Sequence, residues 1–147
     1  MKLFLRLFLI GCLILFTTFS FAQLTITPAG SAMALAQKLV GDGISISNVS
    51  FTGDAAMLMA GHFNDVNHLD VLIDSGIVLT TGRAKTAGTN MGVDGVASGL
   101  ASNDWLLPGD LALAAAVGLP VSSMNDACVL EFDFVPLGDT VKFRYVF

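Results

Sequence analysis

Apolar and polar side chains alternate along several short stretches of the chain, a pattern typical of β-strands with one buried face. The stretch ISISNVSF places Ile44 and Ile46 on one face, and Val49 and Phe51 follow after a one-residue shift in phase. This shift predicts a β-bulge near Ser47, although a simple bend would give the same pattern. Further short strands are expected at 24–28, 55–63 and 77–79.

The strongest alternation lies at the end of the chain, in residues 128–134 and 141–147, with the turn VPLGDT between them. Antiparallel pairing around this turn would place Phe132 beside Phe143 and Glu131 beside Arg144. The same register also joins Leu130 with Tyr145 and Asp133 with Lys142. Because it matches apolar with apolar and acidic with basic side chains, the sequence predicts a closing β-hairpin.

Two short helices are predicted between the strands. Ser31 can cap a helix over 32–40, in which Leu35 and Leu39 share a face and which Gly41 ends. Asp110 can cap a second helix within DLALAAAVG, closed by Gly118. The stretch 82–109 has little periodicity and is expected to be a long loop.

The first 22 residues have the three parts of a secretory signal peptide. Lys2 and Arg6 precede an apolar run, and Ala22 precedes the expected cleavage site. A membrane anchor is the alternative, but the run is short for a bilayer span. The stretch around Cys12 is also similar to a lipobox, although apolar residues continue after the cysteine. We therefore expect an exported protein, secreted or on the cell surface.

The predicted fold is mainly β: a partial antiparallel β-sandwich with two short helices, preceded by the signal peptide. The aromatic face of the closing hairpin needs a second layer to cover it, and no strand follows it in the sequence. We therefore expect residues 23–147 to be an incomplete, N-terminal portion of a larger β-sandwich domain.

Charge narrows the range of partners. The chain has seven Lys and Arg against twelve Asp and Glu; without the two basic residues of the leader, the net charge is about −7. An acidic surface argues against nucleic acid and against anionic membranes. Contact with a membrane is expected only through the leader or through a C-terminal anchor that the sequence lacks.

Among possible cofactors, calcium fits the sequence best, although the spacing of the aspartates is not that of an EF-hand. Asp110 and Asp126 flank the long loop and are the preferred candidate ligands. The alternative is that Asp110 caps a helix and Asp126 shapes the turn before its strand. His62 and His68, with Asp65 between them, form a weaker zinc candidate and are more simply polar loop residues.

Trp105 and Cys128 are the remaining candidates. Trp105, on the long loop, could stack on a sugar ring if exposed, but a lone tryptophan beside two leucines is more often folded inward. Cys128, on an apolar strand, is expected to be a small buried hydrophobe rather than a nucleophile. No paired acid and base or activated nucleophile can be identified, so the sequence predicts no enzyme.

Three stretches resemble the start of the choice-of-anchor L domain, a module of large bacterial surface and secreted proteins. They are GDGISISNVSFTGD (41–54), IDSGIVLTTG (73–82) and NDACVLEFDFVPLGDTVKFRYVF (125–147). The resemblance implies an exported, adhesin-like protein with no enzymatic activity, and it covers only the first half of the family's domain. The alternative is a calcium-assisted polysaccharide-binding module. The partners expected are an extracellular polysaccharide or a surface protein.

Overall fold

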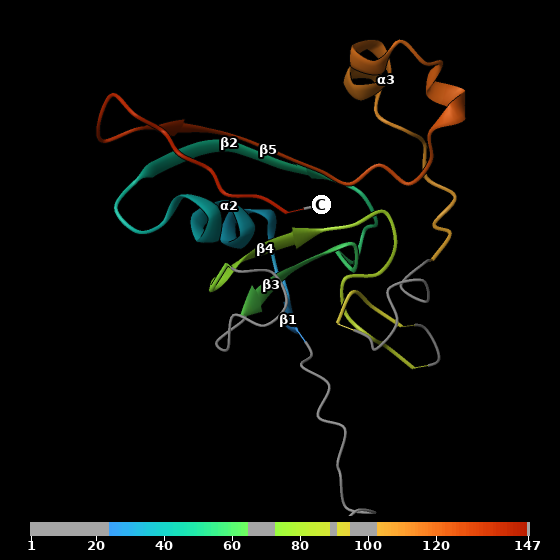
Figure 1. Cartoon of the computed structure of the whole chain (residues 1–147), viewed down its shortest axis with the longest axis horizontal. Helices are drawn as coiled ribbons and strands as arrows, with labels where there is room; N and C mark the ends of the chain where they lie inside the picture. The colour runs from blue at the N-terminus through green and yellow to red at the C-terminus, as the bar shows by residue number, and fades with distance from the viewer. Residues whose placement is uncertain (1–23, 65–72, 89–90, 95–102, 147) are drawn as a thin grey trace, which may run out of the picture.

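The computed structural model describes residues 24–64, 73–88, 91–94 and 103–146, and it is mainly β, as predicted. Its strands form two antiparallel sheets, accompanied by two short α-helices (Figure 1). The predicted signal peptide lies outside the described residues. The elements are β1 (Thr25–Pro28), α2 (Ala32–Val40), β2 (Ser45–Thr52), β3 (Ala60–Asn64), β4 (Ser75–Leu79), α3 (Leu111–Val117), the 3-10 helix η2 (Val121–Ser123) and β5 (Val129–Val135).

One sheet has the strand order β1-β3-β4, and the other pairs β2 with β5. In the two-stranded sheet, apolar residues face apolar residues, with Ile46 opposite Phe134 and Phe51 opposite Leu130. The register shifts between Ser47 and Ser50, which confirms the predicted bulge.

Helix α2 lies between the two sheets and contacts strands of both (Figure 1). The Ser31 Oγ accepts a hydrogen bond from the Ala34 amide at 3.1 Å, and Gly41, with φ of 82°, ends the helix as predicted. Leu35 is fully buried, whereas Leu39 is 38% exposed, so the two leucines do not share one buried face. The helix therefore joins the sheets mainly through its first half.

In the described part of the chain, the core consists of two small apolar clusters. Leu35, Ala29 and Ala60 form one, packed against side chains from both sheets, including Ile77 of β4 and Leu130 of β5. Ile26, Phe63 and Ala84 form the other, next to the three-stranded sheet. Of these two clusters of described residues, the Leu35 cluster is the one that contacts both sheets.

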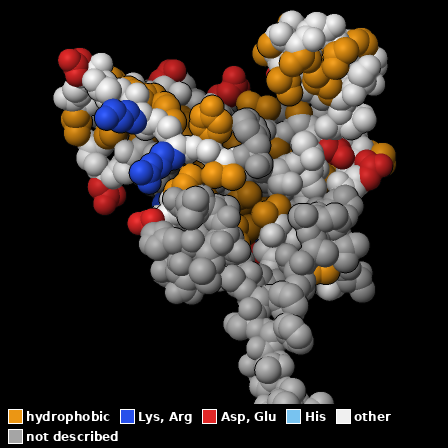
Figure 2. All heavy atoms as spheres, in the orientation of Figure 1, with side chains coloured by type: hydrophobic (Ala, Val, Ile, Leu, Met, Phe, Trp, Pro, Cys, Tyr) orange, Lys and Arg blue, Asp and Glu red, His pale blue; other side chains and the backbone are white. Residues whose placement is uncertain are grey.

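Helix α3 stands apart from the sheets (Figure 1), and its one substantial packing partner among the described elements is η2. Asp110 caps it, accepting the Leu113 amide at 2.7 Å, and Gly118 ends it in the left-handed conformation. Leu111, Leu113 and Val117 are all more than half exposed. Figure 2 shows the resulting concentration of hydrophobic side chains on this lobe.

The predicted closing hairpin is wrong. β5 pairs with β2, and residues 136–146 contain no strand. Two partners suit β5, because β2 offers the same alternation of apolar and polar residues as residues 141–146 do. Pairing with β2 also brings the Leu130 side chain against the core cluster around Leu35, which the local hairpin alone does not provide.

Two smaller predictions also need correction. The strand expected at 77–79 starts two residues earlier, because Ser75 and Gly76 are the first residues of β4. His62, interpreted as a polar loop residue, lies in β3 opposite Thr27 and Ile77, as the strand expected at 55–63 would place it. Its predicted metal partners, Asp65 and His68, lie outside the described residues.

Candidate functional site

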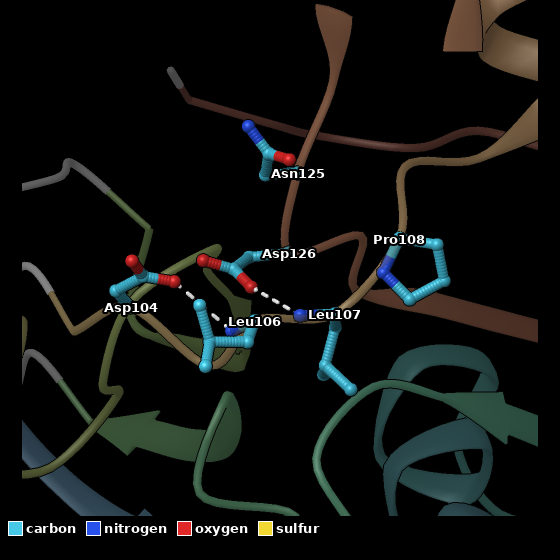
Figure 3. A pocket seen from close by; sticks show the side chains of 6 residues that line it. All are labelled: Asp104, Leu106, Leu107, Pro108, Asn125 and Asp126. Atoms are coloured by element: carbon cyan, nitrogen blue, oxygen red, sulfur yellow. Dashed lines mark hydrogen bonds between the residues drawn. The ribbon is translucent and has the colours of Figure 1, made fainter. Parts of the chain in front are cut away.

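The candidate site is an open pocket of about 570 Å³ at the end of the long loop (Figure 3). It is lined by Asp104, Leu106, Leu107, Pro108, Asn125 and Asp126. The two lining segments are joined by main-chain hydrogen bonds, from the Asp126 amide to the Leu107 carbonyl at 2.9 Å and from the Ala127 amide to the Pro108 carbonyl at 3.2 Å. The pocket is thus formed where the loop crosses the approach to β5.

Asp126 is the buried polar residue of this pocket, with 8% of its surface exposed. Its two carboxylate oxygens accept the Leu107 amide at 2.9 Å and the Trp105 amide at 3.3 Å. Its φ is 54°, in the left-handed region that Asp tolerates better than most residues. Asp126 therefore shapes the turn before β5 and also holds the loop against it.

Asp104 also holds the main chain of the loop, through a single hydrogen bond. Its carboxylate accepts the amide of Leu106 at 2.9 Å, and Leu106 has a positive φ of 56° and an 87% exposed side chain (Figure 3). Each carboxylate that lines the pocket thus has at least one oxygen in use by the main chain of the loop.

The structure places Asp110 and Asp126 on different pockets. Asp110 lines a second pocket of about 420 Å³, together with Leu79, Leu113 and Cys128 among others. Within the described ranges, no group of three or more His, Cys, Asp or Glu side chains is arranged to hold a metal ion. Both aspartates have the helix-capping and turn-shaping roles considered as the alternative, and calcium binding stays a prediction.

Replacing Asp126 by Ala should lower the free energy of unfolding by about 2–3 kcal/mol, because two amides lose their acceptor and Ala is strained at a positive φ. Asp126→Asn should cost less, since Asn tolerates this φ and keeps one oxygen acceptor. Urea unfolding followed by circular dichroism measures both. Equal stability of the wild type and both variants would contradict this role for Asp126.

Trp105 is half-buried rather than displayed on the surface. Its indole Nε1 donates a hydrogen bond to the Gly82 carbonyl at 3.0 Å, and the Arg83 guanidinium lies 5.1 Å from the ring centroid. A cation at this distance interacts favourably with the π face. Trp105 therefore anchors the end of the long loop to its start, just after β4.

Asp54 is the main polar residue that the sequence reasoning missed. It is 7% exposed, and its carboxylate accepts the amides of Ala56 at 3.1 Å, Leu58 at 2.9 Å and Met59 at 2.8 Å. The Gly-Asp pair before an apolar stretch was the available signal, since Asp at the start of a turn bonds nearby amides. Asp54 organises the connection between β2 and β3.

Asp94 is another aspartate whose carboxylate has defined contacts in the loops. It accepts the Thr86 amide at 2.6 Å and forms an ion pair with Lys85 at 3.3 Å. Lys85 also donates to the Ile26 carbonyl at 2.8 Å. This contact attaches the start of the long loop to β1.

Cys128 lies at the second pocket, where its Sγ is 3.6 Å from the Met59 carbonyl oxygen. Desolvation by burial raises the pKa of the thiol from 9.0 to about 11. Because the thiolate is the reactive form, this thiol is poorly suited to nucleophilic chemistry near neutral pH.

The free energy of unfolding should fall as the pH rises from about 9 to about 11, because the folded chain keeps the thiol proton where the unfolded chain loses it. Cys128→Ala should remove this part of the pH dependence, while other groups still titrate. Urea unfolding of both proteins across this range provides the comparison. Parallel curves for wild type and variant would show that the pKa is not raised.

Comparison with known proteins identifies the family. The family model of the choice-of-anchor L domain matches residues 25–147. Searches of curated proteins and of solved structures found no match. Within the part of the chain that the structure describes, no helix has the length and apolar character needed to span a membrane. With the match extending over most of its length, the chain belongs to the choice-of-anchor L domain family.

Proposed function

We propose that this chain is a non-catalytic module of an exported, adhesin-like bacterial protein. Family membership indicates a surface-anchoring-related module of an extracellular or cell-surface protein. Adhesion is the further step of the proposal, and the use made of the acidic side chains supports its non-catalytic part.

The observation that carries the proposal is that the loop carboxylates hold the main chain. Asp54, Asp104, Asp110 and Asp126 each accept at least one loop or helix amide. Carboxylates engaged in this way stabilise loops and are less available to act as acids, bases or nucleophiles. Such an arrangement suits a protein whose task is to present a surface.

Attachment of whole cells tests the proposal. Deleting the gene should reduce adhesion of the producing bacterium to a surface or to neighbouring cells, and the full gene should restore it. A gene lacking codons 2–22 is the matched control, because it encodes the same module without the predicted export signal. Unchanged adhesion after deletion would refute the adhesive role, and substrate turnover by the repurified protein would refute the non-catalytic one.

Calcium-assisted polysaccharide binding is the second candidate, favoured by the position of Trp105, whose main-chain amide donates to Asp126 of the acidic pocket. Trp105 is the only tryptophan, so the tryptophan fluorescence of the protein reports directly on the surroundings of Trp105. A polysaccharide that binds here should change the emission in the presence of calcium and should retard the protein on an affinity gel. The retardation should be lost in Trp105→Ala, whereas Asp139→Ala, at an exposed site elsewhere, should leave both the retardation and the emission change as in the wild type.

A further inference from the structure

The residues that follow β5 form an arm with all its side chains exposed. We call residues 136–146 the C-terminal arm; each of them is exposed, and none belongs to a strand. Its apolar side chains include Val141 at 46% and Phe143 at 55% exposure. An alternating segment of this kind is suited to join the edge of a sheet.

A suitable edge is present on β5. In the described part of the chain, β5 pairs with β2 on one side only, so its other side is an open edge. Glu131 and Asp133 are exposed on this strand, whereas Phe132 and Phe134 are half-buried and their ring centroids lie 6.0 Å apart. The strand thus combines an acidic face with an aromatic one.

The arm and the β5 edge are complementary in charge and in apolar pattern. In one antiparallel register, Arg144 lies opposite Glu131 and Phe143 lies opposite Phe132. The same register joins Lys142 with Asp133 and Val141 with Phe134. Opposite charges at directly facing positions favour a register and disfavour its one-residue slips.

We propose that the C-terminal arm of one chain adds to the β5 edge of a second copy, and that the exchange is reciprocal. Among the described residues of one chain this pairing is not formed, and Lys142, Phe143 and Arg144 are exposed, so these arm residues and the β5 edge can meet a partner. A second copy carries the same acidic edge and the same basic arm, which makes the contact self-complementary about a two-fold axis. Each two-stranded sheet gains a third strand in this dimer.

A charge-reversal cycle tests the pairing. Asp133 also accepts a hydrogen bond from Asn48, so the test uses Glu131 and Arg144. Each single change, Glu131→Arg or Arg144→Glu, should raise the dimer dissociation constant about tenfold, because the contact occurs twice in the dimer. The double variant should restore the wild-type value, and Asp42→Arg, an exposed control, should leave it unchanged.

Sedimentation equilibrium of the full chain over a wide concentration range measures these constants. A wild-type protein that is monomeric throughout overturns the proposal. A dimer indifferent to both charge reversals overturns it as well, because the interface then lies elsewhere. If the charge reversals change only the thermal stability of a monomer, the arm pairs with β5 of its own chain. That result would also refute the proposal.

A mixed cross-linking experiment distinguishes the two chains directly. One copy carries Glu131→Cys and the other carries Arg144→Cys, both in a background with Cys12 and Cys128 replaced by Ala. Directly opposed strand residues lie within disulfide range, so oxidation of the mixture should yield a covalent heterodimer. Combining Glu131→Cys with Asp42→Cys is the control. Equal yields from both mixtures would contradict the exchange.

Discussion

Asp54→Ala should lower the free energy of unfolding by about 3 kcal/mol or more, the largest effect expected of any polar substitution in the described residues. The carboxylate accepts three main-chain amides in a turn where it is itself almost completely buried. Ala leaves all three donors without this acceptor, and a buried donor left unsatisfied costs about 1–3 kcal/mol. Urea unfolding monitored by Trp105 fluorescence measures the loss.

The matched control is Asp139→Ala, which makes the same chemical change at an exposed site. It should alter the stability by less than about 0.5 kcal/mol. The stability of Asp54→Asn should fall between those of the two Ala variants. Its side-chain oxygen can still accept one main-chain amide, whereas its NH2 group would face another amide donor. If Asp54→Ala were as stable as Asp139→Ala, the turn between β2 and β3 would not depend on this carboxylate.

Leu35→Ala should cost about 2–5 kcal/mol, the range found for fully buried leucines that leave a cavity. The side chain is completely buried and packs in the cluster that joins the two sheets. Its loss should therefore loosen α2 from both sheets at once, which hydrogen exchange would detect as lower protection in β2 and β4 together.

Leu39→Ala is the control for this change. It removes the same atoms one turn further along the same helix, where the side chain is 38% exposed, and it should cost about 1 kcal/mol or less. Comparable losses for the two variants would show that burial of Leu35 between the sheets is not what holds them together.

Local signals in the sequence predicted local structure well. The caps Ser31 and Asp110 form the expected hydrogen bonds at the starts of their helices. The change of phase in β2 appears as a shift in register. Each of these features depends on a few neighbouring residues, so the sequence carries the whole signal.

Features that depend on tertiary packing could not be predicted in the same way. The partner of β5 was misassigned because β2 and the C-terminal arm both match its alternation, and packing against α2 distinguishes them only in three dimensions. Leu39 follows the same helical pattern as Leu35, yet only Leu35 reaches the space between the sheets. The burial of Asp54 likewise depends on how β2 and β3 are connected.

In the candidate site, residue types were easier to predict than roles. Asp126 and Trp105 do lie at the long loop, as the sequence suggested, but they are engaged with the main chain of the protein itself. A sequence can show that a carboxylate lies next to a loop. It cannot show whether main-chain amides or a ligand will occupy its oxygens.

The proposed function depends on export, so the mass of the mature protein recovered from the surface or the medium of intact cells is its most direct test. The account predicts a chain that begins at Gln23, after removal of residues 1–22. A protein found only inside the cells with Met1 and the leader still present would contradict it.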